Sequence, residues 1–292
     1  MDLRAVGMGL LFSLMWSSAF ATARIIVADA PPLYALALRF LISGLIAVAI
    51  AAAMGQSARL TRGQARSVIL FGLMQNAAYL GLNFVAMQWI EASLAVIIAA
   101  AMPLMVAALG WAIKGERLPP VGVAGLIAGF CGVALIMGTR VGTGADTLGI
   151  ALCVLGALAL AVATLTLRGA AAGGNLLMVV GLQMLVGSVA LGAIAAVTEV
   201  PSATLSVPLI AAFTYQLLIP GLAATLLWFA LVGRIGAIRA ATFHFLNPFF
   251  GVLIAALLLG ETVGPLDILG VAIVAAGILA VQLARGHSVR SP

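Results

Sequence analysis

The sequence predicts an all-α, polytopic membrane protein whose ten transmembrane helices form two five-helix repeats of inverted topology. Three observations predict this fold. The 292-residue chain is 64% hydrophobic and only 8% charged, whereas soluble domains carry roughly 25% charged residues. Apolar stretches long enough to cross a bilayer recur along the whole chain. One stretch of the sequence also returns at a shift of 145 residues.

The apolar stretches give the positions of the helices, because a helix needs about 20 apolar residues to cross roughly 30 Å of hydrocarbon. The start of the chain resembles a cleavable signal peptide, but its apolar character resumes at residues 25–27, so we expect a retained first helix. The longest polar connections, residues 55–64, 138–146 and 198–208, are too short for an extramembrane domain. The predicted helices lie near residues 5–25, 32–54, 65–87, 91–113, 119–138, 147–168, 174–197, 209–232, 236–259 and 264–284.

The positive charges predict the orientation, because Lys and Arg accumulate in short cytoplasmic loops. With the N-terminus inside, 11 of the 14 Lys and Arg residues fall in the cytoplasm, and only Arg24 and Arg140 fall outside. We therefore expect both termini in the cytoplasm. The net charge of +6 is scattered between apolar segments, which does not favour a nucleic-acid partner. The two cysteines lie in separate apolar runs, so neither a disulfide nor a metal site is predicted.

The internal repeat is the most informative feature. Because each half holds five helices, an odd number, matched residues lie on opposite sides of the membrane, and the halves 1–140 and 141–292 are inverted. Inverted repeats of this kind are typical of secondary transporters. The identical positions are Ala92, Ala95, Pro103, Gly115, Glu116, Pro120, Gly125 and Gly132, which recur as Ala237, Ala240, Pro248, Gly260, Glu261, Pro265, Gly270 and Gly277.

The sequence resembles the drug/metabolite transporter superfamily, specifically its ten-helix members with two EamA-type halves. The likeness rests on residues 14–18 (LMWSS), residues 37–40 (ALRF), and Pro103 and Pro248, each followed by a Gly-Glu pair. It covers the whole chain, and among bacterial members the chain is most similar to the YddG-type amino-acid exporters. The resemblance implies transport by alternating access in the bacterial inner membrane. We expect no cofactor and a functional monomer.

Polar residues along the third helix are the first candidates for the wall of a substrate cavity. Asn76, Tyr79 and Asn83 follow one another at spacings of three and four, which places them on one stripe of an α-helix. Such groups are costly in lipid unless they line a cavity or face inward. An alternative is that the two amides join neighbouring helices.

The fourth and ninth predicted helices each contain one of two matched prolines. His244 and Asn247 come just before Pro248, and Met102 comes just before Pro103. A proline inside a helix removes a backbone hydrogen bond and leaves a carbonyl free. We therefore predict that His244, Asn247 and Met102 line the cavity, and that the two prolines are hinges. The alternative for the prolines is a static kink.

Further candidates lie in the first, second and eighth helices. We interpret Trp16, Ser17 and Trp228 as part of the cavity wall, with core packing as the alternative. Arg39 lies seven residues into the second helix. We expect it to snorkel outward to the membrane interface.

The absence of certain residues and motifs from the sequence disfavours several classes of function. No Asp or Glu lies near the centre of a predicted helix, which disfavours an antiporter of lipophilic cations. No GxxxxGK[ST] loop is present, so ATP is not expected to drive the protein directly. An intramembrane hydrolase using Ser17 or Ser43 with His244 is conceivable, but no GxSxG motif surrounds any serine. We favour an exporter of small amphipathic metabolites, with amino acids first and drugs or other metabolites as the alternative.

Overall fold

The computed structural model describes residues 2–115, 119–142, 145–166 and 175–288. In these ranges ten helical spans are long and apolar enough to cross a membrane, as the sequence predicts. We number them in chain order. Six are single helices, namely α1 (Leu3–Asp29), α2 (Pro32–Ala53), α7 (Pro120–Gly142), α8 (Thr147–Thr166), α9 (Leu176–Thr198) and α14 (Pro265–Ser288), which form spans 1, 2, 5, 6, 7 and 10.

The other four spans are interrupted. Spans 3 and 8 each contain a π-helical segment, in which the backbone hydrogen bonds skip one residue more than in an α-helix. Span 3 comprises α3 (Arg62–Phe71), η1 (Gly72–Tyr79) and α4 (Leu80–Ala86), and span 8 comprises α10 (Val207–Gln216), η2 (Leu217–Ala223) and α11 (Ala224–Ile235). Span 4 comprises α5 (Ala92–Ala100) and α6 (Met102–Lys114), and span 9 comprises α12 (Ala237–Thr242), the 3₁₀ turn η3 (Phe243–Leu246) and α13 (Asn247–Leu259).

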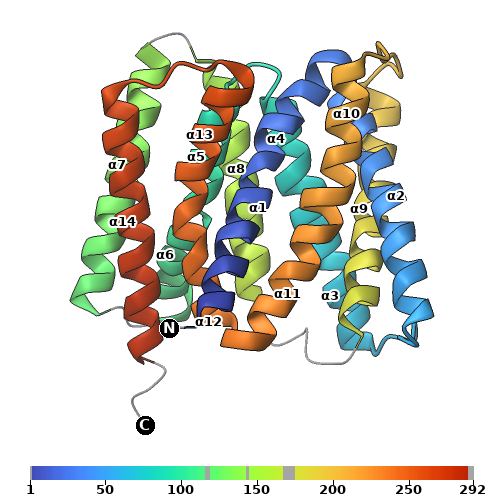
Figure 1. The fold of residues 1–292 in the computed structure, drawn as a ribbon, viewed down its shortest axis with the longest axis horizontal. Coiled ribbons are helices and arrows are strands. Elements are labelled where there is room, and N and C mark those ends of the chain that lie inside the picture. Colours follow the sequence, from blue (N-terminus) through green and yellow to red (C-terminus); the bar gives the residue numbers. More distant parts are fainter. Residues whose placement is uncertain (1, 116–118, 143–144, 167–174, 289–292) are drawn as a thin grey trace.

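The interruptions follow the same shift of 145 residues as the sequence repeat. The π segments begin at Gly72 and Leu217, and the second halves of spans 4 and 9 begin at Met102 and Asn247. Spans 4 and 9 run in opposite directions across the bundle (Figure 1). The inverted repeat is therefore present in the backbone as well as in the sequence.

The two ends of the chain define two faces of the bundle. Helix α1 begins and α14 ends on one face, which we call the terminal face (Figure 1). The opposite face, which we call the distal face, carries the connections that follow α1, α4, α9 and α13. This arrangement fits an even number of crossings.

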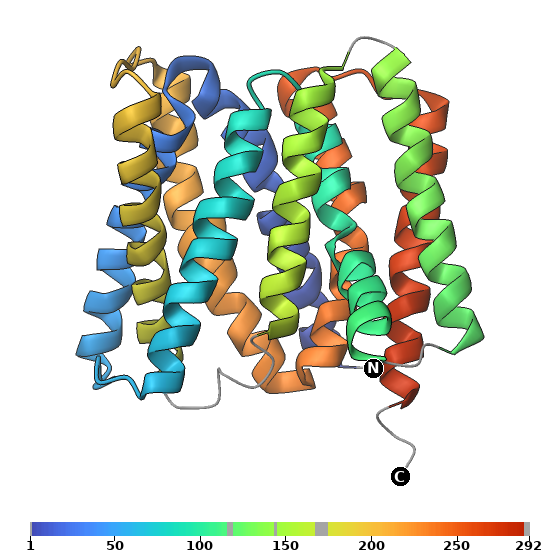
Figure 2. The same cartoon turned by 180° about the vertical axis from the view of Figure 1, so that it is seen from behind.

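Two helix pairs form the ends of the bundle. Helix α2 packs against α9 at one end and α7 against α14 at the other, with the remaining spans between them (Figures 1 and 2). Glycines permit the close approach. A Cβ atom on Gly277 would lie only 2.6 Å from the carbonyl oxygen of Gly125. The repeated glycines Gly125, Gly132, Gly270 and Gly277 approach one another between α7 and α14.

Two further expectations are corrected by the structure. Helix α7 continues to Gly142, so Arg140 lies in its last turn rather than in a polar connection. Arg39 does not snorkel outward. It is 6% exposed and its guanidinium group faces the inside of the bundle, where it donates to the side chain of Gln216 in α10.

Candidate substrate site

A small buried cavity lies where spans 4 and 9 are interrupted. Its volume is about 30 Å³, which is room for one or two water molecules. In this conformation it is smaller than a metabolite, so binding requires the surrounding helices to move. Six of the sequence-predicted residues line it, and five unpredicted apolar residues complete the wall. The lining consists of Trp16, Phe20, Tyr79, Val96, Ala99, Ala100, Met102, Pro103, Leu160, His244 and Asn247.

The interruption in span 9 is held by two serines of α1. Pro248 has no backbone N–H, and the turn before it tightens from α to 3₁₀ geometry. Ser13 donates to the carbonyl of Phe243 at 2.9 Å, and Ser17 donates to the carbonyl of Asn247 at 3.1 Å. The predicted cavity residue Ser17 is therefore absent from the cavity lining and joins two helices. Ser13 was not predicted, although it lies one helical turn from Ser17.

The polar part of the cavity comes from His244 and Asn247. The side-chain nitrogen of Asn247 lies 2.9 Å from Nδ1 of His244. The Oδ1 atom of Asn247 is buried and has no hydrogen-bond partner among the described residues. Leaving a buried acceptor unpaired costs about 1 to 3 kcal/mol. A donor supplied by a bound solute, such as an ammonium group, would satisfy this oxygen.

An aromatic cluster lies on the terminal side of the cavity. The ring of Phe12 lies 4.8 Å from Trp228 and 5.4 Å from His244, and Trp16 is 5.8 Å from Phe12, all measured between ring centroids. Trp228 packs in this cluster and does not line the cavity itself. The cluster adjoins the cavity, because Trp16 and His244 belong to both.

The three polar residues predicted on one stripe of span 3 diverge. The π segment η1 ends at Tyr79 and changes the rotation of the helix, so the α-helical spacing does not apply. Tyr79 lines the cavity. Asn76 donates to the carbonyl of Gln183 in α9 at 2.9 Å, and Asn83 accepts a hydrogen bond from the thiol of Cys153 in α8. Both amides contact other helices: Asn76 contacts α9, whereas Asn83 lies with Tyr79 against Gly156 of α8.

A wide depression opens on the distal face. Its volume is about 930 Å³, and its wall includes Arg24, Asp29, Glu91 and Glu261. Helix α1 contributes to both this depression and the buried cavity, because Phe20 lines the cavity and Arg24, one turn further along, lines the depression. The two spaces are thus separated by about one helical turn along α1.

Carboxylates cap two helices that begin at the distal face. Glu261 accepts hydrogen bonds from the backbone N–H groups of Ala92 and Ser93 at 2.8 and 2.9 Å, at the start of α5. Glu199 accepts likewise from Leu33 and Tyr34 at the start of α2. A carboxylate at a helix N-terminus satisfies unpaired donors and the helix dipole. In both cases a residue of the second half caps a helix of the first half.

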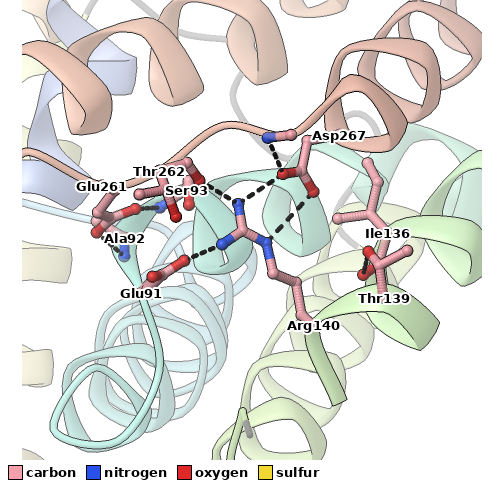
Figure 3. Close-up of polar contacts among 10 residues, drawn as sticks. Glu91, Ala92, Ser93, Ile136, Thr139, Arg140, Glu261, Thr262 and Asp267 are labelled. Atoms are coloured by element: carbon pink, nitrogen blue, oxygen red, sulfur yellow. Dashed lines mark hydrogen bonds and ion pairs between the residues drawn. The ribbon is translucent and has the colours of Figure 1, made fainter. Parts of the chain in front are cut away.

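A charged cluster beside the Glu261 cap joins α7, α14 and the segments that precede α5 and α14 (Figure 3). Arg140 of α7 pairs with Asp267 of α14, with Nη2 to Oδ2 at 3.0 Å, and also with Glu91, which precedes α5. Its Nη2 donates to the carbonyl of Thr262 at 3.2 Å as well. Sequence reasoning missed this cluster, since its members are far apart in the chain.

Glu91 is the member of the cluster whose charge is most sensitive to its surroundings. Burial raises the pKa of its carboxyl above the usual value, and this outweighs the opposing effect of Arg140, while Glu261 and Asp267 raise the pKa further. Glu91 therefore takes up a proton at a higher pH than an ordinary glutamate. Its pairing with Arg140 weakens as the pH falls through that range.

The fold and the cavity define a membrane transporter with a site between two interrupted, inversely related helices. The chain belongs to the EamA-like transporter family, whose profile matches residues 3–138 and again residues 147–283. It is thus a member of the drug/metabolite transporter superfamily and a multi-pass membrane protein.

Similar proteins agree with this assignment. The uncharacterized transporter YvbV of Bacillus subtilis is 26% identical over 85% of this chain and 81% of its own length. A chloroplastic WAT1-related protein of Arabidopsis thaliana is 24% identical over 93% of this chain and 68% of its own length. A solved crystal structure superposes over the full length of both chains with a TM-score of 0.69 at 22% identity, which supports the fold alone.

Proposed function

We propose that this transporter exports small amphipathic metabolites, with neutral and aromatic amino acids as preferred substrates, by alternating access. One observation carries the proposal. The buried cavity combines the aromatic rings of Trp16 and Tyr79 with the unpaired acceptor of Asn247. Aromatic walls suit an apolar side chain, and a buried acceptor suits an ammonium group.

The position of the cavity supports alternating access. It lies at the matched interruptions of spans 4 and 9, and only about one turn of α1 separates it from the distal depression. A helix interrupted near its middle can move one half while the other half stays packed. The conformation described here has the wide opening on the distal face and the aromatic cluster on the terminal side.

A competition panel tests the substrate. Purified protein in sealed proteoliposomes should show counterflow of labelled L-phenylalanine, and neutral amino acids should compete with it. Competition by lipophilic cations such as tetraphenylphosphonium, without competition by any amino acid, would favour the multidrug alternative. Turnover of an ester or amide in detergent would instead favour an intramembrane hydrolase.

We further propose that the protein acts as a monomer in the bacterial inner membrane with both termini in the cytoplasm. The 11-to-2 distribution of cations supports this orientation. A reporter active only in the cytoplasm should work when fused after Arg290 or within residues 59–66, and should fail within residues 201–206. An active reporter within residues 201–206 would contradict the orientation.

A further inference from the structure

An arginine inside the membrane-spanning part of the bundle has no counter-ion in the part of the chain that the structure describes. Arg39 is 6% exposed and lies in α2. Its Nη1 donates to Oε1 of Gln216 at 2.8 Å, and its guanidinium carbon lies 4.5 Å from the ring centroid of Phe40 and 5.9 Å from that of Phe84. No acidic side chain of the described residues forms a salt bridge with it. A buried charge is costly unless an opposite charge or several hydrogen bonds compensate it.

Gln216, the one polar partner of Arg39 among the described residues, is neutral, and its amide nitrogen already makes other hydrogen bonds. Nε2 of Gln216 donates to the carbonyl of Ala19 at 2.8 Å and to the hydroxyl of Thr22 at 3.3 Å. These bonds turn its Oε1 atom toward Arg39. A guanidinium group has five N–H donors, so a single amide oxygen leaves most of them available to a ligand.

A second unpaired group lies on the same side of α2. Ser43 follows Arg39 by one helical turn, is 1% exposed, and its hydroxyl has no hydrogen-bond partner among the described residues. This hydroxyl faces Gly221 in the π segment η2, since a Cβ on Gly221 would lie 3.5 Å from it. Two groups with unused donors thus face the seam between α2 and span 8.

The seam lies beside the route between the two spaces described above. Ala19 and Thr22, which hold Gln216, flank Phe20 of the buried cavity and precede Arg24 of the distal depression on α1. The π segment next to the seam contains Pro220, and π segments are frequent at functional sites.

We propose that Arg39, together with Ser43, binds the carboxylate group of the transported solute. An arginine binds a carboxylate through two parallel hydrogen bonds, and a neighbouring hydroxyl can donate a third. The bound carboxylate supplies the negative charge that the protein does not provide. This inference rests on the proposed function, because an amino acid brings such a carboxylate into the bundle.

The substitution Gln216→Glu tests the inference in a protein that should remain folded. It places a carboxylate beside Arg39, which then has an internal counter-ion. The variant loses the Nε2 donor to Ala19 and Thr22 and gains an ion pair with Arg39. If Arg39 were only structural, the folded variant would transport normally. If Arg39 binds the solute, the new carboxylate competes with it. The control is Gln183→Glu, which introduces the same charge in α9 at a side chain that forms no hydrogen bond with Arg39 among the described residues.

Three probes separate the functional groups: L-phenylalanine, 3-phenylpropanoate, which lacks the ammonium group, and phenethylamine, which lacks the carboxylate. Calorimetric titration of the wild type should show 3-phenylpropanoate binding at least about tenfold more tightly than phenethylamine. Gln216→Glu and Arg39→Gln should each weaken the binding of both carboxylates by at least about tenfold and leave phenethylamine unchanged. Gln183→Glu should retain the preference for carboxylates.

Unchanged carboxylate binding by folded Gln216→Glu, or a wild type that binds phenethylamine as well as 3-phenylpropanoate, would overturn the inference. Should Arg39→Gln fail to fold, Gln216→Glu still decides, since it retains the arginine. A different result would refute the proposed function and leave the inference about Arg39 intact. In that case the wild type binds 3-phenylpropanoate through Arg39 but transports no amino acid in proteoliposomes.

Discussion

Spans 4 and 9 occupy matched places in the two repeats, yet their interruptions differ in chemistry. Both resume as a helix with proline at its second residue, and both end in a glycine with φ near +65°, 64° at Gly115 and 68° at Gly260. At the interruption, span 4 presents Met102, which follows three alanines, whereas span 9 presents His244 and Asn247. The repeat thus preserves the backbone pattern, while the polar groups occur in one copy only.

The contacts with the neighbouring helix differ in the same way. Ser13 and Ser17 of α1 hold the interruption of span 9 through its carbonyls. At the shift of 145 residues, the corresponding residues of α8 are Leu158 and Val162, which have no hydroxyl groups. Span 9 therefore has two side-chain hydrogen bonds to its neighbour that the matched residues of α8 cannot supply to span 4.

The largest expected effect concerns two matched glycines of the adjoining spans 5 and 10. A Cβ on Gly277 would meet backbone atoms of Gly125 and Gly129 at 2.6 to 2.7 Å, whereas one on Gly132 would meet a side-chain methyl of Val274 at 2.9 Å and the carbonyl oxygen of Gly270 less closely, at 3.0 Å. Because a backbone cannot rotate away, Gly277→Ala should cost about 1 to 3 kcal/mol of stability and Gly132→Ala less. Thermal unfolding in detergent measures both. A larger loss for Gly132→Ala would contradict this difference between the halves.

The second prediction concerns the chemistry of the two interruptions. Asn247→Ala should lower the counterflow of labelled L-phenylalanine by about tenfold or more, since it removes the polar group that faces the cavity. The matched variant Met102→Ala should lower it by less than about threefold, because only an apolar contact is shortened. Size-exclusion profiles control for folding. A greater loss in Met102→Ala would place the important contacts in span 4.

The third prediction tests the proposed hinges. Pro103→Ala and Pro248→Ala should each restore the capacity for a backbone hydrogen bond and stiffen the span. Counterflow should slow by several-fold, which corresponds to an increase of about 1 kcal/mol in the activation free energy. The affinity for L-phenylalanine should change little. Both quantities are measured on the same preparations. Wild-type counterflow in both folded variants would mean that the prolines are static kinks.

The smallest effect is expected for the serine tethers. Ser13→Ala and Ser17→Ala each remove one hydrogen bond to span 9 and should each cost about 0.5 to 1.5 kcal/mol of stability. Substituting Leu14, which is exposed on the outer side of the same helix, with alanine is the control. If neither serine variant melts earlier than this control, the tethering of span 9 is not energetically significant.

Much of the site was accessible to sequence reasoning because it depends on sparse residues at matched positions. Polar or helix-breaking residues are easily recognised in apolar stretches, and four of them lie at the interruptions of spans 4 and 9, namely Pro103, Pro248, His244 and Asn247. The apolar part of the cavity wall was not accessible. A residue such as Leu160 does not differ in type from the many leucines that face lipid.

The sequence by itself determined the ten spans and the inverted repeat, because the length of an apolar window and the spacing of prolines and glycines are local properties of the chain. Only the tertiary structure decided which way the polar groups point. Asn76, within the π segment η1, contacts α9, whereas Asn83, beyond it, contacts α8, and the rotation of α2 turned Arg39 inward. The pairing of Arg140 with Asp267 joins residues from different helices. These outcomes depend on helix rotation and packing between distant segments, which no local pattern encodes.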